Sequence, residues 1–286
     1  MSLADRFSAG PVFSLEVFPP KREGDLDALY RVFDEVAPLR PDYISVTYGA
    51  GGGNVGPHFE ITRRLIQLGI TPLAHITCVG QSRGQIGAQL DRLAGVGVKN
   101  VLALRGDPPK GSPGFRPYPE GFAYASDLVA FIRSNYGFCV GGAFYPETHP
   151  EAENAESDLA ALKLKVDAGA EFLISQMFFD NADYFAFVAK ARAAGIGVPL
   201  VPGIRPVTSA RFFDRDFGIS FPAGFREGFS GSDAAADQEY GLAFATAQGR
   251  GLLRGGAPGL ALFIMNRADV AGRLWKDLGL GGAAKG

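Results

Sequence analysis

The sequence predicts a single (β/α)8 barrel, and three observations favour this fold. Apolar runs of about four to six residues alternate with segments whose apolar residues recur at helical spacing, from residue 13 to residue 278. Eight such β–α units follow one another without a linker-like change in composition. The length of 286 residues suits one such barrel, which typically needs roughly 250. We therefore expect residues 1–286 to form one domain that ends in a frayed Gly/Ala-rich tail, about 280–286.

The elements can be assigned in chain order, because short apolar runs typical of strands alternate with the three- and four-residue spacing typical of helices. A short apolar run bounded by turn residues indicates a strand, and the expected strands are Phe13–Phe18, Tyr43–Thr47, Leu73–Cys78, Asn100–Leu104, Phe138–Gly142, Glu171–Ser175, Val198–Val201 and Leu260–Ile264. Apolar residues three and four apart indicate a helix, and the expected helices are Asp25–Val36, Phe59–Leu68, Gln85–Ala94, Ala125–Ser134, Ala152–Ala168, Ala182–Ala194, Gln238–Leu253 and Asn266–Leu278. Two stretches interrupt this alternation, the Pro/Gly-rich loop Lys110–Phe122 and an irregular segment at about 214–236.

A doubly wound sheet is the alternative fold. Gly51-x-Gly53-x-x-Gly56 follows a strand and precedes a helix, as in dinucleotide-binding proteins. However, no acidic residue ends a strand about 20 residues later to bind a ribose, and His75-Ile76-Thr77 occupies that place. We therefore interpret these glycines as a flexible βα loop.

The bulk composition argues against several functional classes. The net charge of -2 provides no basic surface for nucleic acid or an anionic membrane, and no apolar run approaches the roughly 18 residues of a membrane span. Cys78 and Cys139 lie in apolar strand-like runs without metal-ligand spacing, which indicates reduced core residues of a cytoplasmic protein. The three histidines are scattered, and no HExxH, P-loop or GxSxG motif occurs, so we expect no catalytic metal.

The segment NVLALRGDPP, residues 100–109, brings two charged residues to the end of a buried strand. Pro108 and Pro109 prevent further strand pairing, so Arg105 and Asp107 follow the strand where it leaves the sheet. Isolated charges are costly to bury, and the carboxyl ends of barrel strands carry the active sites of this fold. Taken alone, Arg105-Gly106-Asp107 could also hold a structural Arg–Asp pair.

Several other expected strands end in polar residues that face the same rim. In Phe13–Phe18 the alternation places Glu16 opposite an apolar face, near the mouth of the barrel. Each such residue alone could be a satisfied structural group, but together they favour a site, and the set is Glu16, Thr47, His75, Arg105, Asp107, Tyr145, Gln176 and Arg267. Protein side chains do not supply hydride, so redox chemistry here would need an organic cofactor.

Nine blocks of the sequence resemble bacterial methylenetetrahydrofolate reductase, in the order of that family. They span residues 13 to 267 and read FSLEVFPPK, SVTYGAGGG, HITC, NVLALRGDPP, YASDL, YPETHPEA, KVDAGAEFLISQMFFD, PGIRPVTS and FIMNR. The resemblance implies a (β/α)8 barrel that binds FAD, which NADH or NADPH reduces and which then reduces methylenetetrahydrofolate to the methyl form.

The resemblance also implies roles for individual residues. Glu16 matches the general acid that protonates the folate N10, and Asp107 matches the carboxylate that hydrogen-bonds the pterin near the flavin. A carboxylate beside aromatic residues in a lumen can hold a proton, because burial disfavours its charged form. The substrate-binding positions are Gln176, Phe263 and Arg267, with Phe212 nearby. The FAD contacts are Thr47, Tyr48, Ala50, His75, Arg105, Gly106, Asp107, Ala125, Tyr145, His149, Ala152, Asp158 and Lys165.

The sequence departs from the family at two places. Ala161 and Leu164 stand where the family commonly offers an Asn and an Arg to FAD, and losing such a cation weakens binding by about 1–3 kcal/mol. Phe212 and Asp216 stand where the family has a Gln and a substrate-stacking Phe. We expect one of Phe212, Phe213 and Phe217 to take over the stacking.

These departures leave two alternatives to the flavin-dependent reductase. One is a reductase of the same substrate that passes hydride directly from NAD(P)H without flavin, and the other is a folate- or flavin-binding barrel with little catalysis. Retention of both Glu16 and Asp107 counts against a mere binder. No motif selects NADH over NADPH. The exposed faces of barrel helices make a homo-oligomer an open expectation.

Overall fold

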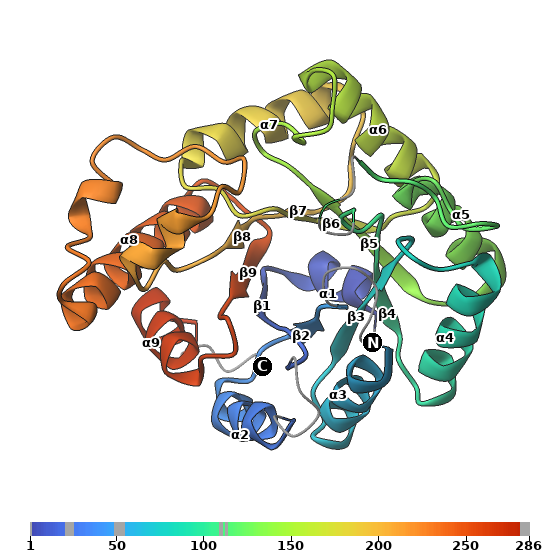
Figure 1. Ribbon diagram of the computed structural model, residues 1–286, viewed down its shortest axis with the longest axis horizontal. Helices are drawn as coiled ribbons and strands as arrows, with labels where there is room; N and C mark the ends of the chain where they lie inside the picture. The colour runs from blue at the N-terminus through green and yellow to red at the C-terminus, as the bar shows by residue number, and fades with distance from the viewer. Residues whose placement is uncertain (1, 21–25, 49–54, 109–110, 112–113, 281–286) are drawn as a thin grey trace.

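The computed structural model describes residues 2–20, 26–48, 55–108, 111 and 114–280. In this part of the chain the strands form one parallel sheet in the order β7-β6-β5-β4-β3-β2-β1-β9-β8, which curls into a barrel (Figure 1). The strands are β1 (Val12–Val17), β2 (Tyr43–Val46), β3 (Pro72–Thr77), β4 (Asn100–Leu104), β5 (Cys139–Phe144), β6 (Phe172–Ser175), β7 (Leu200–Val201), β8 (Gly203–Ile204) and β9 (Gly259–Phe263). The predicted (β/α)8 barrel is confirmed.

The seventh barrel strand is divided by a proline, which the sequence analysis did not anticipate. It predicts one strand, Val198–Val201, whereas the structure has β7 and β8 on either side of Pro202. Pro202 has no N–H to donate, but its carbonyl accepts a hydrogen bond from the Ala261 amide at 3.0 Å. β7 therefore pairs with β6, and β8 pairs with β9 to complete the barrel.

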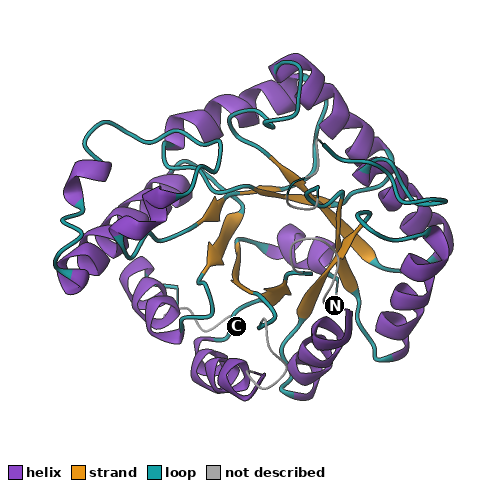
Figure 2. Cartoon of the chain, in the orientation of Figure 1, coloured by secondary structure: helices purple, strands orange, loops and turns teal. Residues whose placement is uncertain are grey.

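An outer ring of helices covers the barrel (Figure 2). Its members are α2 (Leu26–Val36), α3 (Val55–Gln67), α4 (Arg83–Gly95), α5 (Ala125–Asn135), α6 (Ala155–Asp167), α7 (Asn181–Ala193), α8 (Ala234–Arg254) and α9 (Ala268–Leu278). Short 3-10 helices lie at η2 (Ala37–Leu39), η3 (Ala210–Asp214) and η4 (Arg226–Gly228). The last two fall on or near the segment predicted to be irregular.

Side-chain caps explain why two helices begin at other residues than predicted. α6 begins at Ala155 rather than Ala152, because the Asn154 side chain accepts a hydrogen bond from the Ser157 amide at 2.8 Å. α8 begins at Ala234 rather than Gln238, because Asp233 accepts from two amides of its first turn at 3.0 Å each.

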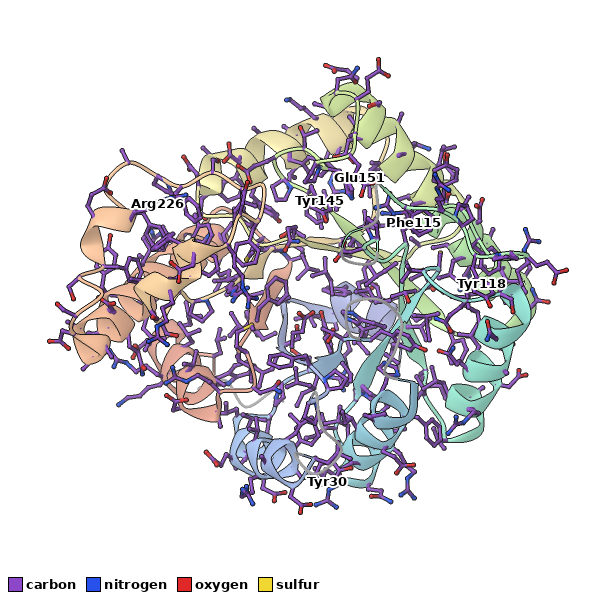
Figure 3. All side chains as sticks on the ribbon, in the orientation of Figure 1. Tyr30, Phe115, Tyr118, Tyr145, Glu151 and Arg226 are labelled. Carbon is purple, nitrogen blue, oxygen red and sulfur yellow. The ribbon has the colours of Figure 1, made fainter. Side chains whose placement is uncertain are left out.

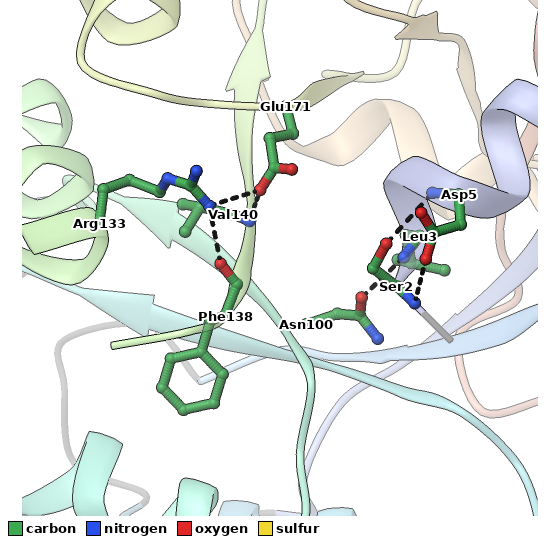
Figure 4. Close-up of polar contacts among 8 residues, drawn as sticks. All are labelled: Ser2, Leu3, Asp5, Asn100, Arg133, Phe138, Val140 and Glu171. Carbon is green, nitrogen blue, oxygen red and sulfur yellow. Dashed lines mark hydrogen bonds and ion pairs between the residues drawn. The ribbon is translucent and has the colours of Figure 1, made fainter. Parts of the chain in front are cut away.

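An additional helix that the sequence analysis missed, α1 (Leu3–Ala9), closes the N-terminal end of the barrel. Figure 1 shows it inside the ring of strands. The Leu3 amide donates to the Asn100 side chain at 2.8 Å (Figure 4), and the rings of Phe7 and Phe172 lie 5.5 Å apart. Figure 4 also shows Arg133 bound to Glu171 at this end. Since α1 fills this end, a ligand reaches the lumen from the C-terminal ends of the strands.

The strand residues divide between two apolar clusters, as the predicted alternation requires. Leu15 and Val17 of β1 pack with the outer helices, while Val12 packs inside the barrel with residues such as Phe172. Glu16 lies between Leu15 and Val17 and therefore faces the lumen.

Candidate active site

Glu16 lies at the centre of a polar cluster at the mouth of the lumen. Its backbone is in register with Ser45 of β2 and Phe263 of β9. Its Oε2 atom lies 3.7 Å from Nε2 of His75 on β3, and the Ser45 hydroxyl is 2.6 Å from the same nitrogen. The Glu16 side chain is only 23% exposed. The structure thus brings Glu16 and His75 together, as predicted.

Burial sets the protonation of this cluster. It raises the pKa of Glu16 to about 8, against the opposing effects of Ser45 and the Arg205 charge. It also lowers the pKa of His75 to about 3, with a smaller contribution from His58. At neutral pH Glu16 is therefore protonated and His75 is neutral, so their contact is not an ion pair. The cluster presents a carboxylic acid that holds its proton.

A second group of polar residues follows β4. Arg105 binds both carboxylate oxygens of Glu151, at 2.7 and 2.8 Å, and its guanidinium lies 4.7 Å from the centre of the Phe115 ring. Figure 3 labels Glu151 and Phe115 in this region, with Tyr145 near them. This pairing raises the pKa of Arg105 and lowers that of Glu151. Gly106 has a left-handed backbone, φ 84°, and Asp107 is exposed beyond it. The sequence analysis did not identify Glu151 or Phe115, because Glu151 lies 46 residues from Arg105 and Phe115 lies in a Pro/Gly-rich loop without a periodic pattern.

Tyr145 and Gln176 extend this group across β5 and β6. The ring of Tyr145 meets the ring of His149 edge-on at 4.6 Å. Burial, then the nearby Asp107 charge, raises the pKa of Tyr145, while a hydrogen bond with Gln176 opposes this. Arg105, Asp107, Tyr145, His149 and Gln176 therefore lie in one neighbourhood.

Lys165 provides a cation beside this group. Its stem packs over Gly142, and its ammonium donates to the Ala143 carbonyl at 2.6 Å. Burial lowers the pKa of Lys165 to about 8. Within the described part of the chain Lys165 has no ion-pair partner, so an anionic group such as a diphosphate suits this position. On that observation, the residues present fit a group that carries a diphosphate.

The remaining residues predicted to contact the cofactor have different surroundings from one another. Asp158 accepts a hydrogen bond from the His149 amide at 2.9 Å, and the Ala152 amide donates to the His149 carbonyl. Thr47 follows β2 at the rim, and Ala125 begins α5. The Tyr48 side chain is buried against His58 of α3, with its hydroxyl near Gln81. Ala50 and most of the Gly51–Gly56 loop lie outside the described residues.

The two departures on α6 lie on its exposed face. Ala161 is exposed, and Leu164 has 62% of its surface exposed. Neither supplies a charge. On the other side of this helix, a hollow of about 430 Å³ lies between α6 and α7 and includes Glu147, Asp158 and Asp183. Of the predicted site residues, only Asp158 lines it.

The aromatic residues after β8 form a connected network of ring contacts. The rings of Phe212 and Phe217 stack at 4.9 Å, and the Arg205 guanidinium lies 4.8 and 5.4 Å from their centres. Phe213 meets the Phe212 ring edge-on at 5.5 Å and also packs against Phe221 and Phe229. Of the three candidates for stacking, Phe212 and Phe217 are the two that lie against Arg205.

The predicted folate-binding residues on β9 and α9 have defined partners. Arg267 binds Asp269 and also donates to Gln238 at 2.8 Å. The ring of Phe263 lies against Gly203, where an added Cβ would be 2.5 Å from it. Gly203 therefore leaves the space that this ring needs.

Arg205 and Gly203 were missed as site residues, although both lie in the block PGIRPVTS. The reasoning that selected Arg105, a charge directly after an apolar strand, applies equally to Arg205. No sequence pattern marked Gly203, because the ring that fills the space beside it, that of Phe263, belongs to another strand.

Comparison with known proteins gives consistent results. The family model described as methylenetetrahydrofolate reductase matches residues 3–279. The 5,10-methylenetetrahydrofolate reductase of Escherichia coli is 34% identical over 273 residues, which cover 93% of this chain and 90% of that protein. Methylenetetrahydrofolate reductase (NADH) 1 of Arabidopsis thaliana is 37% identical over 286 residues, 94% of this chain but 48% of its own. The chain thus spans about half the length of the plant relatives.

A solved structure supports the fold independently. It is an uncharacterized protein from Clostridium thermocellum that binds two copies of 5-methyl-5,6,7,8-tetrahydrofolic acid. It is 15% identical, with a TM-score of 0.67 over 96% of this chain and 98% of its own. In the part of the chain that the structure describes, no helix is both long and apolar enough to cross a membrane.

Proposed function

Because the chain belongs to the methylenetetrahydrofolate reductase family, we propose that it reduces 5,10-methylenetetrahydrofolate to 5-methyltetrahydrofolate, with NADH or NADPH as electron donor and FAD as carrier. The observation that carries this proposal is the position of Glu16 in the lumen, 3.7 Å from His75, where burial raises the pKa of Glu16 to about 8 and lowers that of His75 to about 3. A general acid must hold its proton at the working pH and lie within reach of the atom it protonates.

In the proposed reaction Glu16 donates its proton to N10 of the substrate. The Glu16 O–H bond breaks and an N–H bond forms, while the bond between N10 and the bridging carbon breaks and its electron pair stays on N10. This leaves an iminium between N5 and the carbon, which becomes a methyl group on receiving hydride. FAD, when bound, would accept hydride from the nicotinamide donor and supply it to this carbon.

The other residues of the site bind and orient in this proposal. Asp107 and Gln176 contact the pterin, and Phe263 and Arg267 line the folate. Phe212 and Phe217, which already stack with each other, are placed to stack on an aromatic part of the substrate. Lys165, Arg105 and His149 lie where FAD would be held.

The test compares wild-type protein with Glu16→Gln in two half-reactions. Oxidised flavin absorbs at about 370 and 450 nm, so its reduction by NADH and its reoxidation by the folate can each be followed. We expect Glu16→Gln to retain flavin and its reduction by NADH, but to slow folate-dependent reoxidation by about 10²–10⁴-fold. Equal reoxidation in both proteins would overturn the role of Glu16.

A flavin-independent reductase of the same substrate is the second candidate. The exposed, uncharged Ala161 and Leu164 on α6 favour it, because they offer a diphosphate no charge. A purified protein that stays colourless after addition of FAD and desalting, yet oxidises NADH with methylenetetrahydrofolate, would establish this route. A protein that neither holds flavin nor turns over would leave only a binding function.

A further inference from the structure

Arg205 lies in the same layer of the barrel as Glu16. β8 pairs with β9 through Gly203↔Ala261 and Ile204↔Leu262, and Glu16 pairs with Phe263. Continuing this register by one residue places Arg205 beside Phe263 and thus two strands from Glu16. Ile204 packs with the outer helices, so Arg205 faces the lumen.

The surroundings of Arg205 hold its charge in place but leave it without a counter-ion. Phe212 and Phe217 lie against the guanidinium, and its Nη1 atom is 4.0 Å from the sulfur of Met177. Among the described residues no carboxylate forms an ion pair with it. Burial lowers the pKa of Arg205, and the Glu16 charge opposes this. A half-buried guanidinium with unused donors favours an anion close by, and Glu16 becomes one when it loses its proton.

We propose that Arg205 is the counter-charge of Glu16, held by Phe212 and Phe217 so that it stabilises the carboxylate that remains after Glu16 gives up its proton. This inference rests on the proposed function, in which Glu16 is the general acid. Arg205 acts through Glu16 and is therefore a positioning residue rather than a catalytic one.

A positive charge near Glu16 allows one residue both to hold its proton before the reaction and to release it during the reaction. Burial helps Glu16 to hold its proton but makes the proton hard to release, because the carboxylate is left in a poorly solvated place. The titratable groups that the described strands turn toward Glu16 are Tyr43 of β2 and His75 of β3, and neither is cationic at neutral pH. Phe263 of β9 is neutral, and the charge of Arg215 acts on Arg205, whose pKa it lowers. Arg205 is thus the cation that favours ionised Glu16.

The test measures the titration of Glu16 directly, without turnover. The infrared band of its protonated carboxyl group is isolated by subtracting the spectrum of Glu16→Gln at each pH. The variants are Arg205→Met, which keeps the stem and removes the charge, Arg205→Gln, which keeps donors without charge, and Arg205→Lys, which keeps the charge. Arg226→Met is the matched control, because Arg226 also lies over two phenylalanine rings, Phe213 and Phe221, at 5.2 and 4.6 Å.

We expect the pKa of Glu16 to rise by about one unit or more in both Arg205→Met and Arg205→Gln. It should stay near the wild-type value in Arg205→Lys and in Arg226→Met. An unchanged pKa in the neutral Arg205 variants, or an equal rise in Arg226→Met, would overturn the inference while leaving the general acid in place. A wild-type pKa near the ordinary 4.5 would instead refute the proposed acid itself, and the counter-charge with it.

Discussion

Glu16 and Glu151 both lie near an arginine at the C-terminal end of the barrel, but the two regions place them in opposite states. Glu151 is partly exposed and binds Arg105 through two short hydrogen bonds, which lower its pKa. Glu16 is buried beside neutral groups, and Arg205 acts on it without direct contact, so burial dominates and raises its pKa to about 8. The comparison teaches that solvation and direct pairing, rather than the residue types, decide which carboxyl group is an acid at neutral pH.

The largest expected effect concerns stability and pH at Glu16. Its folded pKa lies above the unfolded value, so its protonation stabilises the fold below about pH 4.5, and this contribution is lost as the pH rises toward 8. Each unit of difference corresponds to about 1.4 kcal/mol. Between pH 5 and pH 8, wild-type protein should therefore lose up to a few kcal/mol of unfolding free energy relative to Glu16→Gln. Urea unfolding at the two pH values measures this, and parallel curves for the two proteins would contradict the raised pKa.

Gly203→Ala should have the next largest effect and sharpen the comparison. An added Cβ would lie 2.5 Å from both the Phe263 ring and the Ser175 carbonyl oxygen. We expect a loss of about 1–3 kcal/mol from this overpacking. Displacement of Phe263, the neighbour of Glu16 in register, should also admit water and lower the pKa of Glu16, while Glu151 is unaffected. Gly197→Ala, where an added Cβ has open space, is the control. Equal stability of the two variants would argue against the close packing.

The smallest effect is expected at the paired carboxylate. Glu151→Gln removes an ion pair that is partly open to solvent, so it should cost at most about 1 kcal/mol at pH 7. The pKa of Glu151 is lower in the folded protein than in the unfolded chain. The ion pair therefore stabilises the fold at pH values above the unfolded-state pKa, and this stabilisation is lost as the pH falls through the folded-state pKa. Wild-type protein and Glu151→Gln should therefore converge in acid, opposite to the behaviour at Glu16. A difference that grows in acid would contradict this assignment.

Local pattern was enough to predict the barrel and the face that Glu16 occupies. The period-two alternation in the first strand required Glu16 to face away from Leu15 and Val17, and the structure places it so. The same reasoning placed Asp107 and Gln176 at strand ends. These predictions succeeded because each depends on neighbouring residues only.

The features that were missed depend on contacts between distant segments. Arg105 finds its partner Glu151 46 residues later, and Phe263 fits only because Gly203 on another strand lacks a side chain. The capping Asn154 was read as helix interior, since its role depends on the turn that precedes α6. The division of the seventh strand at Pro202 follows from one missing N–H, which a search for apolar runs does not register.

The central claim is that Glu16 holds its proton at neutral pH and gives it to the substrate. The most direct test is the pH dependence of single-turnover reduction of methylenetetrahydrofolate, which applies whether or not hydride passes through flavin. We predict a rate that is constant at neutral pH and falls as the pH rises through about 8, where Glu16 loses its proton, with this limb absent in Glu16→Gln. A rate that already falls near pH 4.5, or the same limb in Glu16→Gln, would contradict it.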